Sequence, residues 1–327
     1  MRLKLSGPDY KGKDPVVALQ DFKERIRQYE KKYAPIGECE EAAGYSFCQM
    51  IDVGRKFITH NIKGYLATQT VYFLQHFNLS PRQIWLTRHG ESLDDVKGRI
   101  GGNSDLSPYG IQYSKALTSF ISAQRKIWIE EHTPINEEAT YQAAIRTKSF
   151  HVWTSNVKRS IQTAAYFTDP PFQLSHERML DELNAGLLDG KTREEVQIFY
   201  SRWVEQRVKN KMEYRYPGTS GEGYVDLTNR LKIVILEVER LMDHVCIIGG
   251  LAVLRVLLAY FRGLQREEIA DLRVPLGTVY LIEPVCWHAQ TLRSSYRLNT
   301  LQKPYGIQYK EYLYDGETDQ FYLKNGK

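Results

Sequence analysis

The chain has 327 residues, of which 42% are hydrophobic and 25% are charged, and its formal net charge is +5. These values are ordinary for a globular protein, and the sequence has no lysine- and arginine-rich tract of the kind that follows a nucleic-acid backbone. The four cysteines have no metal-ligand spacing, which argues against a zinc site or a disulfide framework and suits a reducing, cytoplasmic compartment. The longest apolar stretch, residues 245–261, is interrupted by two glycines and Arg255. A strand followed by a buried helix is therefore expected there instead of a membrane span.

Residues 1–80 are expected to form a first domain that ends at the Asn-Leu-Ser-Pro break over residues 78–81. Apolar residues at helical spacing predict helices over residues 15–33 and 62–77. Residues 7–13 have the glycine and lysine positions of a phosphate-binding P-loop, but Asp14 follows where that motif needs Ser or Thr to hold Mg²⁺. A turn before a helix is the better interpretation, and we expect no kinase activity from this chain.

A short apolar strand expected over residues 84–86 leads directly into Thr87-Arg88-His89-Gly90-Glu91. Because open α/β sheets bind ligands at the carboxyl ends of their strands, we expect Arg88 and His89 to face a ligand. A histidine beside an arginine can attack phosphorus while the guanidinium grips the phosphate oxygens. A lone histidine at a strand end is more often structural, so the surrounding residues must decide between the two interpretations.

Residues 98–107 form a glycine-rich loop with Arg99 as a further guanidinium. Glycine permits backbone conformations in which main-chain N–H groups can approach an anion. Ser107 followed by Pro108 predicts a helix start, and this helix is expected over residues 107–124. A strand, an anion-binding loop and a helix in this order support the functional interpretation of His89, although a glycine-rich loop alone is weak evidence.

The remaining pattern predicts an α/β domain over residues 81–295, with helices on both faces of the sheet. Further strands are expected over residues 151–154, 245–248 and 278–282, and further helices over residues 158–167, 192–207, 224–240 and 251–261. Residues 125–150 are expected to be a polar, partly helical insertion. The tyrosine-rich tail over residues 296–327 has no predicted role.

The segments Arg88-His89-Gly90-Glu91 and Gly101-Gly102-Asn103-Ser104 resemble the histidine phosphatases, above all the fructose-2,6-bisphosphatase half of the bifunctional 6-phosphofructo-2-kinase/fructose-2,6-bisphosphatases. The resemblance continues at Trp153-Thr154-Ser155, Gln162-Thr163-Ala164, Asp181-Glu182-Leu183-Asn184-Ala185-Gly186 and Tyr214-Arg215-Tyr216-Pro217. It implies a histidine-phosphatase-like sheet with helices on both faces, preceded by a mostly helical C-terminal remnant of a P-loop kinase domain over residues 1–80. The family's own P-loop would precede Met1, so we expect either an incomplete gene product or a natural remnant.

The resemblance implies a two-step phosphoryl transfer in fructose 2,6-bisphosphate metabolism, and so a role in the regulation of glycolysis. His89 would attack the 2-phosphate, Glu182 would protonate the leaving sugar oxygen, and water would hydrolyse the phosphohistidine. Arg88 and Arg159 would grip the reacting phosphate, without a metal or a cofactor. The resemblance assigns the remaining substrate contacts to Arg99, Asp95, Arg207, Lys211, Tyr224 and Arg255. A solvated helix face is the alternative for Arg207 and Lys211.

Four positions depart from the family pattern. Gly250 and Leu251 stand in place of a second histidine and a glutamine, Asp95 in place of an asparagine, and Arg193 in place of a tyrosine. A carboxylate at Asp95 would repel a phosphate unless Arg99 or Arg159 pairs with it. Loss of one preorganised hydrogen-bond donor commonly costs about 10²–10³ in rate, so turnover is expected to be impaired.

Three functions stay open. The first is a fructose-2,6-bisphosphatase with impaired turnover, and the second is a catalytically inactive module that binds a sugar phosphate or regulates a 6-phosphofructo-2-kinase. The third is a phosphatase of another substrate, because Leu251 and Arg193 alter the sugar side. The expected partners are a sugar phosphate and either a second copy of the chain or a kinase domain, with no role for nucleic acid or membrane.

Overall fold

The structure of the chain is a computed structural model that describes residues 14–51, 56–76, 78, 80–133, 148–285 and 306–324. It divides into two compact units, residues 1–77 with 286–304 and residues 78–285 with 305–327. The P-loop-like segment 7–13 and most of the insertion expected over residues 125–150 lie outside the described residues. No helix within the described ranges is long and apolar enough to cross a membrane.

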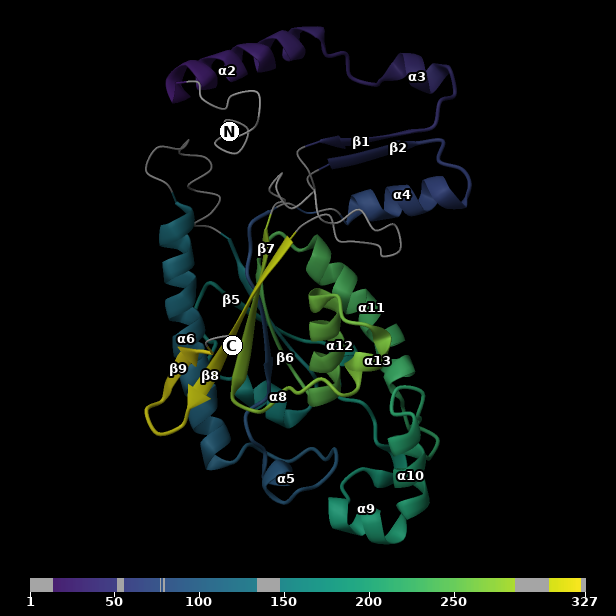
Figure 1. The fold of residues 1–327 in the computed structure, drawn as a ribbon, viewed down its shortest axis with the longest axis vertical. Helices are drawn as coiled ribbons and strands as arrows, with labels where there is room; N and C mark the ends of the chain where they lie inside the picture. Colours follow the sequence, from purple (N-terminus) through teal and green to yellow (C-terminus); the bar gives the residue numbers. More distant parts are fainter. Residues whose placement is uncertain are drawn as a thin grey trace. The chain divides into compact units, whose positions relative to one another are not determined.

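The first unit is mostly helical and also carries an antiparallel strand pair (Figure 1). Its elements are α2 (Pro15–Lys32), α3 (Glu38–Ala42), β1 (Phe47–Ile51), β2 (Lys56–His60) and α4 (Tyr65–Gln75). The helices expected over residues 15–33 and 62–77 correspond to α2 and α4, whereas the sequence analysis does not predict the strand pair. The Asp14 carboxylate caps α2, because it accepts hydrogen bonds from the N–H groups of Val16 at 2.9 Å and Val17 at 3.2 Å. The aspartate that breaks the P-loop pattern therefore has a structural role.

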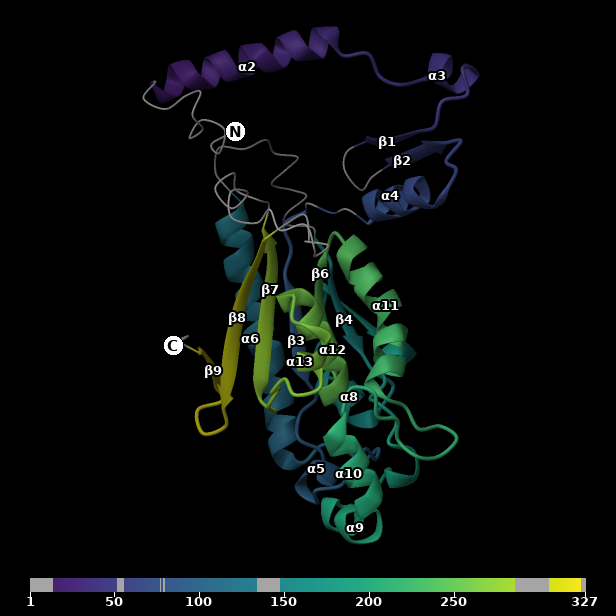
Figure 2. The same cartoon turned by 45° about the vertical axis from the view of Figure 1, so that its right-hand side comes forward.

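The second unit is built on a seven-stranded sheet with the order β5-β4-β6-β3-β7-β8-β9 (Figures 1 and 2). Four neighbouring strands are parallel: β5 (Phe172–His176), β4 (Phe150–Thr154), β6 (His244–Gly249) and β3 (Ile84–Arg88). The other three are antiparallel to their neighbours: β7 (Thr278–Val285), β8 (Gly306–Asp315) and β9 (Gln320–Leu323). The strands expected from the sequence correspond to β3, β4, β6 and β7.

The helices that surround this sheet are α5 (Leu93–Val96), α6 (Pro108–His132), α8 (Lys158–Thr163), α9 (Arg193–Phe199), α10 (Ser201–Lys209), α11 (Tyr224–Arg240), α12 (Leu251–Arg262) and α13 (Arg266–Ile269). The helix expected over residues 192–207 is two helices, because Tyr200 between them has the non-helical angles φ −133° and ψ 29°. The helix expected over residues 107–124 continues instead to His132.

Helices cover both faces of the sheet, as the sequence pattern predicts. Successive side chains of a strand point to opposite faces, so a strand such as β3, with consecutive apolar residues, has an apolar surface on each face that must be covered. Trp85 of β3 packs with Tyr113 and Leu117 of α6. Its neighbours Ile84 and Leu86 belong to the core cluster that includes the buried faces of α11 and α12. Figure 2 shows α6 on one side of the strands and α11 and α12 on the other. The expected α/β fold class is therefore confirmed.

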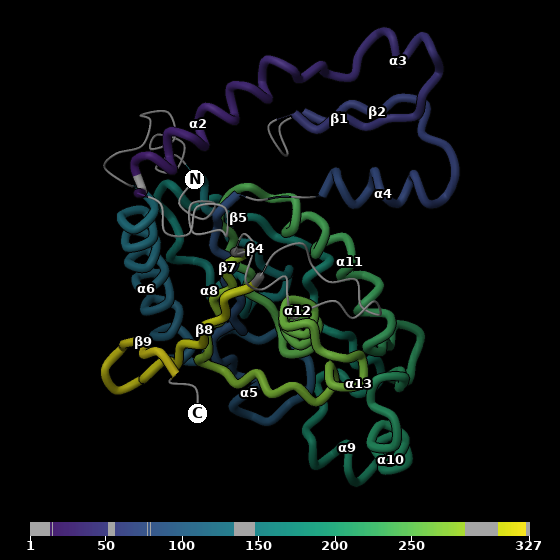
Figure 3. Tube along the Cα trace, turned by 45° about the horizontal axis from the view of Figure 1, so that its top comes forward, coloured from purple at the N-terminus to yellow at the C-terminus, as the bar shows by residue number. Residues whose placement is uncertain are grey.

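The tyrosine-rich tail supplies two strands that the sequence analysis does not predict. In β8, Ile307 and Tyr309 pack against the core cluster of α11 and α12, whereas Tyr312 packs against that of α6. Phe321 of β9 stacks on Phe120 of α6 with a ring-centroid distance of 4.5 Å, and β9 lies beside α6 (Figure 3). The tail thus extends the sheet and covers part of the α6 face.

Parallel pairing brings three chain segments together at one edge of the sheet. Arg88 at the end of β3 is the register partner of Gly249 at the end of β6, and the N–H of His89 donates to the carbonyl of Gly249 at 3.1 Å. The end of β4 at Thr154 is paired with Ile248. The residues that follow β3, β4 and β6 are therefore neighbours, as expected for a ligand site in an open α/β sheet.

Candidate active site

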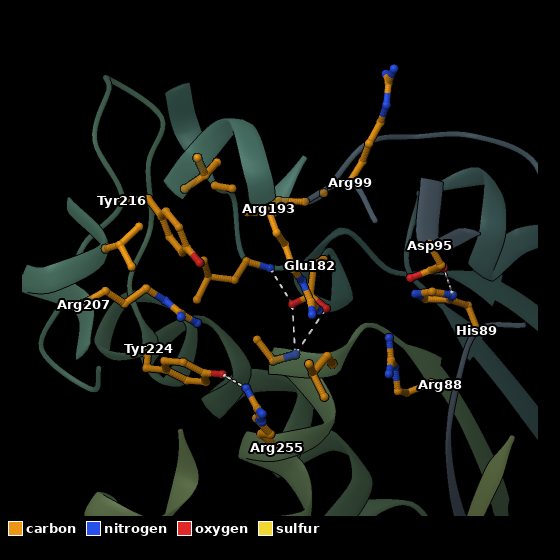
Figure 4. Close-up of a pocket in the computed structure, with 18 of the residues that line it drawn as sticks. Arg88, His89, Asp95, Arg99, Glu182, Arg193, Arg207, Tyr216, Tyr224 and Arg255 are labelled. Carbon is orange, nitrogen blue, oxygen red and sulfur yellow. Dashed lines mark hydrogen bonds and ion pairs between the residues drawn. The ribbon is translucent and has the colours of Figure 1, made fainter. Parts of the chain in front are cut away.

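A cavity of about 410 Å³ lies at this edge of the sheet (Figure 4). Nine of the ten predicted site residues line it: Arg88, His89, Asp95, Arg99, Arg159, Glu182, Arg207, Tyr224 and Arg255. The tenth, Lys211, is not among its lining residues, and its Nζ donates to Asp271 Oδ1 at 2.9 Å. The departures Arg193 and Leu251 also line the cavity.

His89 is held as a neutral imidazole whose one ring lone pair accepts a hydrogen bond from a guanidinium. Its Nδ1 lies 2.8 Å from the carbonyl oxygen of Gly90, and because a carbonyl only accepts, Nδ1 carries the hydrogen. The other ring nitrogen, Nε2, accepts a hydrogen bond from Arg159 Nε at 3.0 Å. Burial, followed by the charges of Arg159 and Arg88, lowers the pKa of His89 to about 3. At neutral pH the ring therefore has the uncharged form that a nucleophile needs.

Arg159, in the first turn of α8, links this histidine to the glycine-rich loop. Its side chain is almost fully buried, and Nη1 donates to the carbonyls of Gly101 at 3.1 Å and Gly102 at 2.7 Å. Both glycines have positive φ, 68° and 72°, a conformation that other residues resist. The loop therefore orients Arg159 through its carbonyls, and the N–H of Gly102 donates to Asp189 at 3.1 Å. This corrects the expectation that the N–H groups of the loop receive the anion, at least for Gly102.

Asp95 has a different partner from the one expected. Its Oδ2 accepts hydrogen bonds from the N–H of Ser92 at 2.9 Å and the Ser92 hydroxyl at 2.5 Å, as part of a capping box at the start of α5. It also lies 3.9 Å from His89 Nδ1. Burial opposes the ionisation of Asp95, but the charge that His89 carries when protonated, the hydrogen bonds from Ser92 and the charge of Arg88 together lower its pKa. Ser92, and not Arg99 or Arg159, thus engages this carboxylate.

Arg88 contributes a buried guanidinium beside His89. Its Nη1 donates to the carbonyl of Val274 at 3.2 Å, whereas its Nε is buried and has no hydrogen-bond partner among the described residues. Burial lowers the pKa of Arg88, and the charges of Asp95 and Glu182 oppose this shift; an arginine remains a cation in any case. A buried N–H donor without a partner is costly, and the Arg88 side chain lines the cavity, where its guanidinium places positive charge beside His89.

The opposite end of the cavity has its own cations and hydroxyl groups (Figure 4). Arg255 of α12 donates through Nη1 to the Tyr224 hydroxyl at 2.8 Å, and Arg207 of α10 lies 5.7 Å from the ring centroid of Tyr216. Burial raises the pKa of Tyr224, although Arg255 opposes this shift, so its hydroxyl stays protonated. Tyr216 is a lining residue that the sequence analysis does not select, although it lies in the Tyr-Arg-Tyr-Pro segment that carries part of the resemblance.

Arg193, the first residue of α9, points into the centre of the cavity, toward Glu182 (Figure 4). Arg99 is exposed, and its side chain is directed away from Arg88 and Glu182 (Figure 4). The two ends of the cavity are thus both cationic and separated by Glu182. Within the described ranges, no group of three His, Cys, Asp or Glu side chains comes together as metal ligands would. The donors of the cavity suit a ligand with two anionic groups.

Glu182 lies against the backbone of α12. Its Oε1 accepts from the N–H of Leu183 at 2.8 Å and from the N–H of Ala252 at 3.1 Å, and its Oε2 is 3.2 Å from the same Ala252 nitrogen. Gly250 has φ −86° and ψ 177°, which any residue can adopt. A Cβ atom at Gly250 would nevertheless lie only 2.5 Å from Glu182 Cδ and still closer to Oε2. The glutamate therefore fills the space that a side chain at position 250 would need.

An α/β sheet with a buried, neutral histidine beside arginines at the end of a strand is what a histidine phosphatase requires, and sequence comparison agrees with this class. The model of the histidine phosphatase superfamily (branch 1) matches residues 132–293, and the 6-phosphofructo-2-kinase model matches residues 1–81. The chain thus combines a match to a kinase model over its first 81 residues with a match to a histidine phosphatase model, and its homologues are 6-phosphofructo-2-kinase/fructose-2,6-bisphosphatases. His89 lies between the two matched ranges.

Curated relatives extend the match across the chain. The 6-phosphofructo-2-kinase 1 of Saccharomyces cerevisiae is 45% identical over 98% of this chain and 36% of its own length. A probable 6-phosphofructo-2-kinase of Schizosaccharomyces pombe is 42% identical over 98% of this chain and 51% of its own length. The 6-phosphofructo-2-kinase/fructose-2,6-bisphosphatase of Gallus gallus is 39% identical over 88% of this chain and 55% of its own length. The chain thus spans between about a third and just over half of these relatives.

Proposed function

We propose that this chain is a phosphatase that hydrolyses the 2-phosphate of fructose 2,6-bisphosphate through a phosphohistidine at His89. The observation that carries the proposal is the state of His89, which is buried, neutral and bonded through Nδ1 to a carbonyl, so that Nε2 keeps the lone pair. Cations at both ends of the cavity support a bisphosphate as the ligand. The free cysteines Cys39, Cys48 and Cys246 support a cytoplasmic location.

In the first step, Nε2 of His89 attacks the phosphorus, and the bond from phosphorus to the sugar oxygen breaks. Arg159 now donates to Nε2, so its N–H must turn to a phosphate oxygen when substrate enters. The guanidinium of Arg88, which lines the cavity beside His89, would bind a second phosphate oxygen. Both guanidinium groups would stabilise the charge that develops on the phosphoryl group. Glu182 would give a proton to the leaving sugar oxygen, and water would then release phosphate from the histidine.

A non-catalytic, sugar-phosphate-binding module is the second candidate, and one observation favours it. Position 250 carries no side chain, and Glu182 is bonded to the backbone N–H groups of Leu183 and Ala252. A site without the second imidazole, and with its acid turned toward the backbone, could retain binding while turnover is lost. The cations that grip an anion are present in either case.

A phosphate-release assay with several sugar phosphates separates the candidates. We expect slow release of phosphate from fructose 2,6-bisphosphate, with fructose 6-phosphate as the second product, and no release by His89→Ala. If phosphate is released only from another sugar phosphate, that compound and not fructose 2,6-bisphosphate is the substrate. Binding of the bisphosphate without any release, measured by calorimetry, would favour the non-catalytic module. Formation of fructose 2,6-bisphosphate from ATP and fructose 6-phosphate would contradict the expectation that this chain has no kinase activity.

A further inference from the structure

The contact between Glu182 and Gly250 links two positions that are far apart in the sequence. The carboxylate accepts the N–H of Ala252 in the first turn of α12 and the N–H of Leu183. It can do so only because Gly250 has no side chain, since a Cβ there would lie 2.5 Å from Glu182 Cδ and 3.0 Å from Cγ. Any other residue at position 250 would therefore force the glutamate into another rotamer.

This position of Glu182 does not suit a proton donor. Both carboxylate oxygens are engaged by backbone N–H groups, and a general acid must instead bring its O–H to within hydrogen-bond reach of the leaving oxygen. The acid must therefore break its contact with Ala252 before it can act. Hydrogen bonds from backbone N–H groups at a helix start to a carboxylate are among the stronger ones in proteins.

We propose that Gly250 is a positioning residue that holds Glu182 in a resting place on Ala252, away from the leaving group. The inference rests on the proposed function, because it gives Glu182 the role of the acid. In the working position, the Glu182 O–H would transfer its proton to the sugar oxygen while the phosphorus–oxygen bond breaks and Nε2 of His89 bonds to phosphorus. A side chain at position 250 would exclude the resting place and favour the working one.

The dependence of the rate on the leaving group tests this inference. A sugar alkoxide needs a proton to leave, whereas the nitrophenolate of p-nitrophenyl phosphate needs little help. We expect Gly250→Ala to raise kcat with fructose 2,6-bisphosphate by about tenfold, which corresponds to 1.36 kcal/mol in the barrier, and to change p-nitrophenyl phosphate hydrolysis less than about twofold. In the Glu182→Gln background, the same alanine should give no gain, because positions 182 and 250 act as one unit.

Equal rates of wild type and Gly250→Ala with the bisphosphate, a fall in both rates, or a gain that persists in the Glu182→Gln background would each overturn the inference. A second measurement does not need this variant to fold. Amide exchange of Ala252, followed by NMR on protein labelled with ¹⁵N-alanine, should become about tenfold faster in Glu182→Ala, and an unchanged rate would refute the resting contact. Failure of the proposed function looks different: neither substrate would then phosphorylate His89.

Discussion

Replacing Arg159 by methionine should slow the chemistry strongly and lower the stability of the fold only moderately. The guanidinium is almost fully buried and forms three hydrogen bonds, to His89 Nε2 at 3.0 Å and to the carbonyls of Gly101 and Gly102 at 3.1 and 2.7 Å. Methionine keeps much of the volume but supplies no donor. Loss of a preorganised donor at the transferred phosphoryl group should slow the phosphorylation of His89 by about 10²–10³, or ~2.7–4 kcal/mol. The freed carbonyls should lower the free energy of unfolding by ~1–3 kcal/mol.

The same variant should raise the pKa of His89. Burial is the largest cause that lowers the pKa of His89 to about 3, and the charge of Arg159 is the next. Arg159→Met removes this positive charge, so the pKa of His89 should rise toward its ordinary value while burial keeps it below that value. An NMR titration of the ring carbon protons measures the shift. Rapid-quench labelling from fructose 2,6-bisphosphate carrying ³²P at its 2-phosphate measures the rate.

Lys158→Met is the matched control, because Lys158 precedes Arg159 in α8 and its side chain is 58% exposed, 4.0 Å from Asp105. Removing this solvated cation should leave the labelling rate within about twofold, since exposed ion pairs contribute little. The reasoning would be refuted if Arg159→Met labelled His89 as fast as the wild type and left its titration unchanged. Equal losses in both variants would also contradict it, because general loss of positive charge would then be the cause.

Three further predictions concern other residues. The double change Gly250→His, Leu251→Gln should raise turnover by roughly 10²-fold, because it supplies an imidazole donor at the phosphate end of the cavity. The φ of −86° at Gly250 accepts a histidine, and the new side chain displaces Glu182 from its contact with Ala252. A folded variant without any gain in steady-state assays would mean that the site is impaired elsewhere. Burial lowers the pKa of His244 to about 3, so the unfolded chain takes up a proton at this histidine before the folded chain does as the pH falls below ~6.5, and His244 alone should lower the free energy of unfolding by ~3 kcal/mol by pH 4. His244→Asn keeps an acceptor for the N–H of Gln83, now bonded to Nδ1 at 3.1 Å, and should remove this share of the dependence of Tm on pH, while the share of His89, whose pKa is also about 3, remains; an unchanged slope would exclude His244 as a source. Arg193→Tyr removes a cation from the cavity and should raise KM for the bisphosphate by about tenfold with kcat nearly unchanged, whereas an unchanged KM would show that Arg193 does not contact substrate.

Local patterns in the sequence predict much of the second unit. The helix expected over residues 224–240 has these same bounds in the structure, because its apolar positions repeat at helical spacing. A strand over residues 84–86 is predicted because a short apolar run leads directly into charged residues, and in the structure it continues to Arg88. Strands β8 and β9 are not predicted, since their side chains find partners only when β8 pairs with the edge of β7 and packs against the two core clusters on either side of the sheet. The break at Tyr200 likewise has no local signal that the sequence analysis could use.

In the site, too, local motifs predict which residues take part, whereas the contacts between distant segments depend on the fold. His89 and Arg88 follow from the motif at a strand end, and the family resemblance selects seven further residues that line the cavity, besides the departures Arg193 and Leu251. The bond between Arg159 and the loop carbonyls depends on how two loops meet, which no local pattern encodes. The sequence also shows that position 250 lacks a side chain. That Glu182 fills the resulting space could be learned only from the structure.

The most direct test of the account is to identify the residue that becomes phosphorylated. Brief exposure to fructose 2,6-bisphosphate labelled at the 2-phosphate, followed by quenching in base and peptide mapping, should find an acid-labile, base-stable phosphate on His89. The buried, neutral ring with a lone pair on Nε2 predicts this adduct, and His89→Ala should carry no label. Label that persists in His89→Ala, or that is found on another residue of the wild type, would contradict the proposed phosphohistidine mechanism.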